Sequence, residues 1–271
     1  MRFLILLLFL PLKGITQLSF ETIKMSKSVE ETSGLEILGN YLITHNDSGD
    51  KPKLYIINQE GEKIMEIELN QLKNKDWEDI AADSENYYIA DTGNNYGTRE
   101  NLKIYILDKD FFLQGKISIR YQSQTTFSRE LKNKYDAEAL AVVGDHLVLF
   151  SKNRKTLKSE IYSFPKVAGD YVLTPKAVID SKALITAADY YSDKDLIALT
   201  GYNFQGDQFF YTIKNFVKNG YDKIKLERYL IPIKPAQIEA VKIIDEDEFW
   251  ITSESEDNGK PRLFRFKLKS D

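Results

Sequence analysis

Three glutamates stand directly before short apolar segments of the chain: Glu78 in DWEDIAAD, Glu138 in DAEALAVV and Glu239 in QIEAVKII. Carboxylates that lie close together repel one another, and burial also raises their pKa values. A cation relieves both costs, and Ca²⁺ takes about six to eight oxygen ligands from carboxylates, carbonyls and water. If the fold gathers these segments at one place, the pattern predicts a ring of oxygen ligands around one cation.

The same segments belong to a unit that repeats along the chain. The units begin with TSGLEIL at 32, WEDIAAD at 77, AEALAVV at 137, TAADYYS at 186 and IEAVKII at 238. In each unit a second strand-like segment ends in polar residues, and a third segment follows it. Fourth strands are expected near 62–68, 116–122, 171–179 and 224–230. Repeats of four short strands are typical of β-propeller blades.

The two ends of the chain predict how this ring closes. The fifth unit ends before any fourth strand, while LSFETIKM at 18–25 has strand composition and no unit of its own. An N-terminal strand that completes the last blade leaves no open sheet edge. We therefore predict an all-β fold, a β-propeller of five four-stranded blades, with a six-bladed ring or a β-sandwich as alternatives.

The first strand of each propeller blade lines the central channel. Aligning the units places five residues at equivalent positions: Ser33, Glu78, Glu138, Ala187 and Glu239. We predict that Ser33 and the three glutamates bind Ca²⁺, with Thr186 beside Ala187 as a further hydroxyl. Zinc is disfavoured because the chain has no cysteine and two histidines. The alternative is a dry channel in which the glutamates pair with Lys152, Arg99 or backbone amides.

The ends of the second strands form one rim of the channel in such a fold. The candidate catalytic residues there are Asp47, Asp91, Lys152 and Glu254. The candidate substrate-binding residues are Asn46, Asn94, Arg99 and Ser253. A cation among acids and amides suits phosphate-ester hydrolysis, because the metal polarises a phosphoryl oxygen while Lys152 and Arg99 steady its charge. The same Asp and Asn residues also form Asx-turns at strand ends. His45 is a further candidate base, and Trp77 either packs between blades or walls the pocket.

Two family resemblances follow from these residues. The order Ser, Glu, Glu, small residue, Glu is similar to the calcium-activated nucleotidases (apyrases), five-bladed propellers with a central Ca²⁺. This resemblance implies that Ser33, Glu78, Glu138 and Glu239 are ion ligands, with Ala187 replacing a serine of the family. The phrases NDSG, DWEDIA, IADTGNN, DAEAL and TSE resemble secreted bacterial propellers of the phytase-associated, esterase-like and SdiA-regulated-like groups. That resemblance covers most of the chain and implies a fold more than a chemistry.

Composition limits the class of protein and its location. The net charge of -4 gives no basic field for nucleic acid, and the absence of cysteine excludes disulfides and thiolate ligands. Residues 1–16 have the pattern of a secretory signal peptide, with Arg2 before an apolar run too short to span a bilayer. We therefore expect an exported monomer, periplasmic or extracellular, with one propeller domain over 17–271 and no membrane span.

Two functions fit these observations. The first is a Ca²⁺-dependent hydrolase of phosphate esters, phosphoanhydrides or esters at the channel rim. The second is a non-catalytic propeller that carries a structural ion and binds a glycan, peptide or protein. Tyr96, Tyr202 and Phe204 lie in rim loops and favour the second function, whereas acids combined with Lys152 favour the first.

Overall fold

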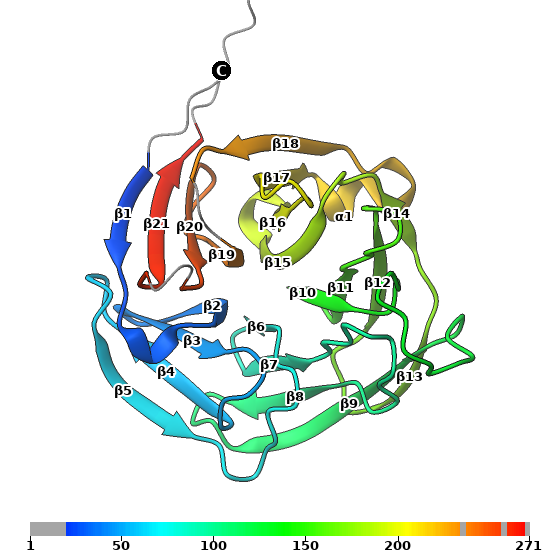
Figure 1. The fold of residues 1–271 in the computed structure, drawn as a ribbon, viewed down its shortest axis with the longest axis horizontal. Coiled ribbons are helices and arrows are strands. Elements are labelled where there is room, and N and C mark those ends of the chain that lie inside the picture. Colours follow the sequence, from blue (N-terminus) through cyan, green and yellow to red (C-terminus); the bar gives the residue numbers. More distant parts are fainter. Residues whose placement is uncertain (1–19, 234–236, 256–258, 269–271) are drawn as a thin grey trace, which may run out of the picture.

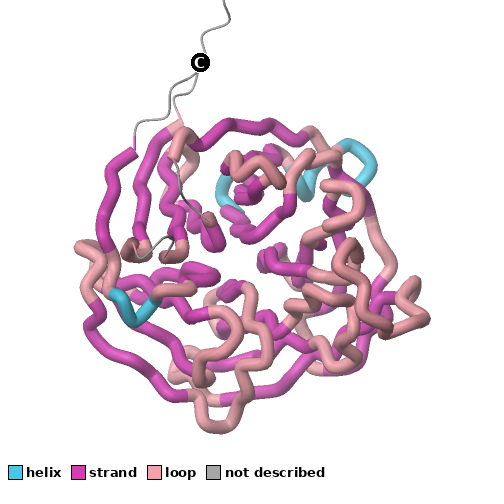
Figure 2. Tube along the Cα trace, viewed as in Figure 1, coloured by secondary structure: helices cyan, strands magenta, loops and turns pink. Residues whose placement is uncertain are grey.

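The computed structural model describes residues 20–233, 237–255 and 259–268 of the 271-residue chain. Over these residues five sheets surround a central channel, and the chain passes through them in order round the ring (Figure 1). Strands form most of the ring, and the helices are short turns between strands (Figure 2). The five-bladed propeller is therefore confirmed, and the six-bladed and sandwich alternatives are wrong. The predicted signal peptide, residues 1–16, lies outside the described residues.

Blades 1 to 4 are each built from strands that follow one another outwards from the channel. Blade 1 contains β2 (Thr32–Leu38), β3 (Tyr41–Asn46), β4 (Lys53–Ile57) and β5 (Lys63–Glu68). Blade 2 contains β6 (Asp79–Ala82), β7 (Asn86–Asp91), β8 (Lys103–Asp108) and β9 (Leu113–Tyr121). Blade 3 contains β10 (Ala137–Val143), β11 (His146–Ser151), β12 (Ser159–Pro165) and β14 (Ala177–Ile179). Blade 4 contains β15 (Leu184–Tyr191), β16 (Leu196–Tyr202), β17 (Gln208–Lys214) and β18 (Leu226–Ile231).

Blade 5 combines the two ends of the described chain. It contains β19 (Ile238–Ile243), β20 (Glu248–Ser253), β21 (Arg262–Lys267) and β1 (Phe20–Lys24). β1 pairs antiparallel with β21, from Phe20 opposite Phe266 to Lys24 opposite Arg262. This pairing confirms the predicted closure by the N-terminal strand. It removes an exposed edge that would otherwise be a template for aggregation.

Helices contribute little to the described chain. The helical turns are α1 (Phe216–Asn219), η1 (Lys27–Val29), η2 (Ser192–Lys194) and η3 (Tyr221–Lys223). Within the described ranges, no helix has both the length and the apolar character that crossing a membrane requires.

One predicted strand is placed differently from our expectation. The segment expected near 171–179 is divided into β13 (Gly169–Leu173) and the three-residue strand β14. β13 leaves blade 3 and runs parallel to β9, so blade 2 has a fifth strand. Pro175 lies between the two strands, and proline cannot donate to a strand ladder. The break therefore follows from the sequence, whereas the pairing with blade 2 does not.

The core is divided among the interfaces between neighbouring blades. Small buried residues occupy the inner strands: Ala137, Ala139, Ala187 and Ala240. Aromatic residues fill the wider space farther out, where the Phe210 ring centroid lies 4.7 Å from that of Phe249 and 5.0 Å from that of Phe266. Small residues near the axis and large ones outside give each blade its wedge shape, and they bring the inner strands close together.

Candidate functional site

β-Bulges occur at the start of three inner strands, whereas Glu78 directly precedes β6, whose ladder with β7 is regular. The ladder shifts between Ala137 and Ala139, between Ile185 and Ala187, and between Ile238 and Ala240. The unpaired residues are therefore Glu138, Thr186 and Glu239. Bulges re-aim side chains and are frequent next to active sites.

The bulges correct the alignment of the units at two positions. Ala187 pairs with Thr200, so Thr186, and not Ala187, is equivalent to Glu138. In blade 1 the shift lies between Ser33 and Glu36, and Ser33 itself pairs with His45. The alignment was wrong there because a bulge adds a residue that periodicity alone does not reveal.

Hydroxyl groups near the bulges link neighbouring blades. Ser33 Oγ donates to the carbonyl of Glu78 at 2.5 Å, and Thr186 Oγ1 donates to the carbonyl of Ile238 at 2.6 Å. Both hydroxyl groups are buried. Ser33 therefore fixes the backbone that carries Glu78, and its proton is already committed to that bond.

The positive charge of Lys152 compensates the negative charges of two of the three glutamates predicted as ligands, Glu138 and Glu239. Its ammonium group forms an ion pair with Glu138 and lies 3.9 Å from Glu239 Oε1. Glu239 also accepts a 2.7 Å hydrogen bond from Gln237 Nε2, and Arg154 Nη2 lies 3.6 Å from Glu138. From the sequence we considered that the glutamates pair with Lys152 in place of a metal ion. Glu138 and Glu239 do pair with Lys152.

Glu78 has a different environment. Its side chain is buried, and Oε1 has no hydrogen-bond partner among the described residues. Its ligand oxygen and one oxygen each of Asp47 and Asp76 lie within 4.8 Å of one another. Asp136 and Glu138 form a second such group with Glu78, but Arg154 forms an ion pair with Asp136. In the group of Asp47, Asp76 and Glu78 the cation contact is Arg99 Nη1, which lies 3.9 Å from Asp76 Oδ2, while Arg99 Nη2 lies closer to Asp91, at 2.7 Å.

We call the acids at this end of the channel the entrance cluster: Asp47, Asp76, Glu78, Asp136, Glu138, Glu239 and Glu254. Burial, and then the charges of Asp47 and Asp136, raises the pKa of Asp76 to about 7. Burial and Asp47 raise the pKa of Glu254 to about 8. Burial also raises the pKa of Glu138 to about 8 against the opposing effect of Lys152, and burial with the Glu138 charge raises that of Glu78 well above its ordinary value. Without a cation, the cluster therefore retains protons near neutral pH.

Asp76 and Asp136 were missing from our sequence-based candidates. Each precedes a channel glutamate by two residues, so that Asp-Xaa-Glu occurs at 76–78 and again at 136–138. This repeated pair of acids at the start of an inner strand was the available signal. Gly93 also supports the site, because a Cβ there would collide with Glu78 Oε1 and the Asp76 carboxylate.

Several predicted catalytic and substrate-binding residues hold the loop after β7. Arg99 Nη2 donates to Asp91 Oδ1 at 2.7 Å, and Arg99 Nη1 donates to the carbonyl of Gly93 at 2.6 Å. Asn94 accepts from the Arg99 backbone N–H and donates to the carbonyl of Tyr135. The backbone N–H of Asp76 donates to Asp91 at 3.2 Å. Asp91, Asn94 and Arg99 therefore support the Asp76 segment. Asp91 Oδ2 has no hydrogen-bond partner among the described residues, and Lys103 Nζ lies 3.7 Å from it.

Two further rim candidates come from blade 1, Asn46 and His45, and both make contacts within the protein. Asn46 Nδ2 donates to the carbonyl of Ser28 and to Asp50. His45 is fully buried and lies edge-on to Trp77, and burial lowers its pKa to about 4. His45 is thus a neutral packing residue, and the fully buried Trp77 belongs to the interface between blades 1 and 2.

The remaining rim candidates come from blades 4 and 5. Ser253 is buried, and within the described chain its hydroxyl has no hydrogen-bond partner. The Lys152 ammonium lies 5.0 Å from the centroid of the Tyr202 ring. Phe204 is 61% exposed, which leaves an apolar side chain in the neighbouring loop open to solvent.

Comparison with known proteins supports the fold alone. No protein-family model matches the chain, and no curated protein matches it. The PQQ-bound form of an aldose sugar dehydrogenase from Streptomyces coelicolor superposes with a TM-score of 0.55 at 10% identity, over 94% of this chain and 99% of that chain. A putative exported protein from Bacteroides fragilis has a TM-score of 0.44 at 10% identity, over 97% and 98% of the two chains. The family resemblances drawn from sequence motifs stay predictions.

Proposed function

We propose that this protein binds Ca²⁺ at the channel entrance, in contact with Asp47, Asp76 and Glu78. The carboxylate oxygens there are hard donors, which Ca²⁺ prefers over softer nitrogen or sulfur ligands. The observation that carries the proposal is the buried Glu78 Oε1 atom, which has no hydrogen-bond partner in the described chain. A buried carboxylate without a partner is costly, and a cation supplies the missing contact.

The revised ligand set keeps Glu78 and changes its predicted companions. Lys152 already supplies positive charge to Glu138 and Glu239. Ser33 Oγ bonds to the Glu78 carbonyl, and we assign it the role of positioning that segment. We propose Asp47 and Asp76 as the companions of Glu78, because one oxygen of each lies within 4.8 Å of a Glu78 oxygen. The ion then lies at the rim, toward blades 1 and 2, where a ligand from solvent can reach it.

We further propose hydrolysis of a phosphate ester or phosphoanhydride at this rim. A bound Ca²⁺ polarises a phosphoryl oxygen. Burial and the Asp47 charge raise the pKa of Glu254, and Lys152 opposes this effect. Glu254 is half-buried and is therefore the acid best placed to exchange a proton with a bound substrate.

The second candidate function is a non-catalytic binding propeller with a structural ion. The observation that favours it is the internal use of Asp91, Asn94 and Arg99, which removes three of the predicted catalytic or substrate-binding groups from the reaction. Export to the periplasm or the medium remains part of the proposal and rests on the signal-peptide pattern of residues 1–16.

Calorimetric titration with CaCl₂ tests the ion, and a substrate screen tests the chemistry. We expect wild-type protein to bind Ca²⁺ and Glu78→Gln to lose this binding, with Glu36→Gln as a matched control that retains it. With Ca²⁺ present, hydrolysis of p-nitrophenyl phosphate or ATP that Glu254→Gln abolishes supports the hydrolase. Ca²⁺ binding without hydrolysis of any phosphate ester, diphosphate or carboxylate ester contradicts the hydrolase and supports the binding propeller.

A further inference from the structure

Within the channel, a lysine ammonium group lies between carboxylates of different blades. Lys242 Nζ is 2.9 Å from the Glu36 carboxylate and 3.1 Å from that of Asp189, which belong to blades 1 and 4. Lys242 itself belongs to blade 5. An ammonium group has three N–H donors, so it can bridge more than one carboxylate. The channel therefore accommodates a lysine ammonium group as its cation.

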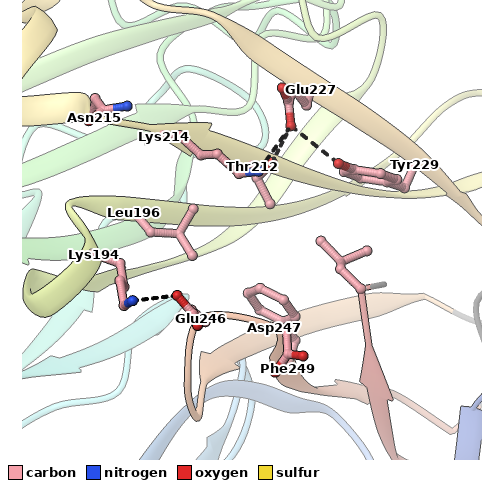
Figure 3. A pocket seen from close by; sticks show the side chains of 11 residues that line it. Lys194, Leu196, Thr212, Lys214, Asn215, Glu227, Tyr229, Glu246, Asp247 and Phe249 are labelled. Carbon is pink, nitrogen blue, oxygen red and sulfur yellow. Dashed lines mark hydrogen bonds and ion pairs between the residues drawn. The ribbon is translucent and has the colours of Figure 1, made fainter. Parts of the chain in front are cut away.

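Two further places show the same arrangement. Lys152 forms an ion pair with Glu138 and lies 3.9 Å from Glu239 Oε1, so one lysine again contacts acids of two blades. A cavity of about 580 Å³ between blades 4 and 5 is lined by Lys194 and Glu246, whose charged groups lie 2.5 Å apart (Figure 3). At each of these places the chain itself supplies the lysine.

The group of Asp47, Asp76 and Glu78 differs, because among the described residues no lysine forms an ion pair with it. The cation closest to it is Arg99, whose Nη1 lies 3.9 Å from Asp76 Oδ2. The same guanidinium donates to Asp91 Oδ1 at 2.7 Å, so it is already committed on its other side. Glu78 is 3% exposed, and its Oε1 atom has no hydrogen-bond partner in the described chain. This third acid group lacks the lysine that the others have.

The geometry of the group suits an ammonium nitrogen. One oxygen of each acid lies within 4.8 Å of the other two. A point therefore exists no more than about 2.8 Å from all three, which is the length of a charge-assisted N–H···O bond. Gly93 leaves this place open, because a Cβ there would collide with Glu78 Oε1 and the Asp76 carboxylate. Asp47 is half-buried and the Asp76 side chain is 14% exposed, so the group is open to solvent on one side.

We propose that Asp47, Asp76 and Glu78 bind the ammonium group of a lysine side chain from a partner peptide, in competition with Ca²⁺. The proposal rests on the ion site proposed above, because the same three acids hold both cations. Lysine suits the site better than arginine, since its ammonium group is compact and ends an unbranched stem, whereas a guanidinium presents five donors in a rigid fork. The excess of acids in the entrance cluster also attracts a positively charged peptide.

Exposed aromatic side chains favour a peptide over a free diamine. Tyr96, in the loop after β7, is 43% exposed, and Phe204, in the loop after β16, is 61% exposed. Both loops belong to the rim of the channel. Aromatic residues are enriched at protein interfaces, and here they offer contacts to the residues on either side of the bound lysine. A free diamine has no such residues and gains nothing from these side chains.

Calorimetric titration of the mature protein with the peptide acetyl-Gly-Gly-Lys-Gly-Gly-amide, in EDTA and in a buffer without primary amines, tests the proposal. We expect binding that weakens at least about tenfold in Glu78→Gln, which loses a charge-assisted hydrogen bond. Glu100→Gln makes the same charge change at an exposed position of the loop after β7 and should bind as the wild type does. Neither variant should lower the unfolding midpoint in EDTA, which separates loss of binding from loss of fold.

Changes in the peptide test the chemistry of recognition. Acetylation of the lysine removes its charge and should abolish binding. Trimethylation keeps the charge but removes the three N–H donors, and it should weaken binding at least about tenfold. Adding Ca²⁺ in excess of EDTA should displace the lysine peptide.

Four results would overturn the proposal. They are no binding of the lysine peptide, equal affinity of Glu78→Gln and the wild type, equal binding of the acetylated peptide, and equal or tighter binding of 1,5-diaminopentane, which would identify a free diamine as the ligand. The outcome is separable from that of the Ca²⁺ function. Ca²⁺ binding without peptide binding contradicts this proposal alone, whereas peptide binding without Ca²⁺ binding contradicts the ion function and supports the lysine site.

Discussion

The channel contains a second charged cluster, deeper than the entrance cluster. In it, Lys242 Nζ donates to Glu36 at 2.9 Å and to Asp189 at 3.1 Å. In the entrance cluster, by contrast, one oxygen of Glu78 has no hydrogen-bond partner among the described residues. Lys242 follows Glu239 by three residues, and Asp189 follows Thr186 by three, so the two levels come from the same strands. Backbone N–H groups of Ile37 and Ile243 bond the remaining oxygens of the deeper acids.

The difference separates a structural charge cluster from a candidate binding site. At the deeper level, burial opposes the charged form of Lys242, but the charges of Asp189 and Glu36 raise its pKa above the ordinary value. The lysine therefore stays charged and both acids are paired. At the entrance, seven acids face three cations, Lys152, Arg154 and Arg99, and Arg99 also pairs with Asp91, so negative charge is in excess.

Removing the deeper lysine should have the largest effect. Lys242→Met leaves Glu36 and Asp189 buried without a cation, and we expect the free energy of unfolding to fall by about 3–5 kcal/mol. Urea unfolding in EDTA measures this loss. Lys267→Met is the matched control, because Lys267 is 60% exposed and its ion pair with Glu248 contributes less than about 1 kcal/mol. Equal effects of the two variants would contradict the structural role of the deeper cluster.

The acids of the entrance cluster should make the folded state less stable as pH rises. Ordinary acid unfolding has the opposite sign, with stability falling as pH is lowered. The folded pKa values of Asp76, Glu138 and Glu254 are raised to about 7, 8 and 8, above those of the unfolded chain. The folded state therefore binds more protons between about pH 4.5 and pH 8, and stability falls as pH rises through this range. In EDTA we expect a loss of several kcal/mol between about pH 5 and pH 9, since each unit of pKa shift corresponds to about 1.4 kcal/mol.

Saturating Ca²⁺ should remove most of that pH-dependent loss, because the ion replaces the protons. Glu254→Gln should reduce the slope in EDTA, since one of the shifted groups no longer titrates. A stability profile that is flat, or that rises from about pH 5 to pH 9 in EDTA, would contradict the excess of negative charge at the entrance.

Neutralising one acid of the deeper cluster and one of the entrance cluster should change the free energy of unfolding in opposite directions. Glu36→Gln loses the charge that pairs with Lys242 and should lower the free energy of unfolding by about 1–3 kcal/mol. Glu78→Gln removes a buried carboxylate without a partner, so in EDTA near pH 8 it should be neutral or stabilising. Urea unfolding of both variants under identical conditions gives the comparison. Equal destabilisation by both would mean that Glu78 has a partner within the protein.

The smallest expected change in stability comes from the Ser33 hydroxyl, which donates a hydrogen bond to the Glu78 backbone carbonyl. Ser33→Ala removes its bond to the Glu78 carbonyl and should cost about 1 kcal/mol, while Ser123→Ala, in an exposed turn, should change stability by less than about 0.5 kcal/mol. Stabilisation by Ca²⁺ should survive in Ser33→Ala, because Ser33 positions a ligand and is not one. If Ca²⁺ no longer stabilised the Ser33→Ala variant, Ser33 would be a Ca²⁺ ligand.

The sequence predicts the fold well and the site in part. Five units, their four strands and closure by 18–25 follow from periodicity and composition, and three glutamates do lie at the channel entrance. The bulges are invisible to periodicity, and this explains the errors at Ala187 and Ser33. Pairing with Lys152 was one of two alternatives that the sequence left open, and its contact with Glu239 joins blades 3 and 5. The path of β13 depends on packing rather than local pattern.

Thermal unfolding in EDTA and then in Ca²⁺ tests the central claim most directly. A ligand at 100 times its Kd adds about 2.7 kcal/mol of stability, which for a chain of this size raises the midpoint by roughly 5–11 °C. We expect this rise in the wild type and in Glu36→Gln, and no rise in Glu78→Gln. An absent rise in the wild type, or an equal rise in Glu78→Gln, would contradict a Ca²⁺ site at the channel entrance.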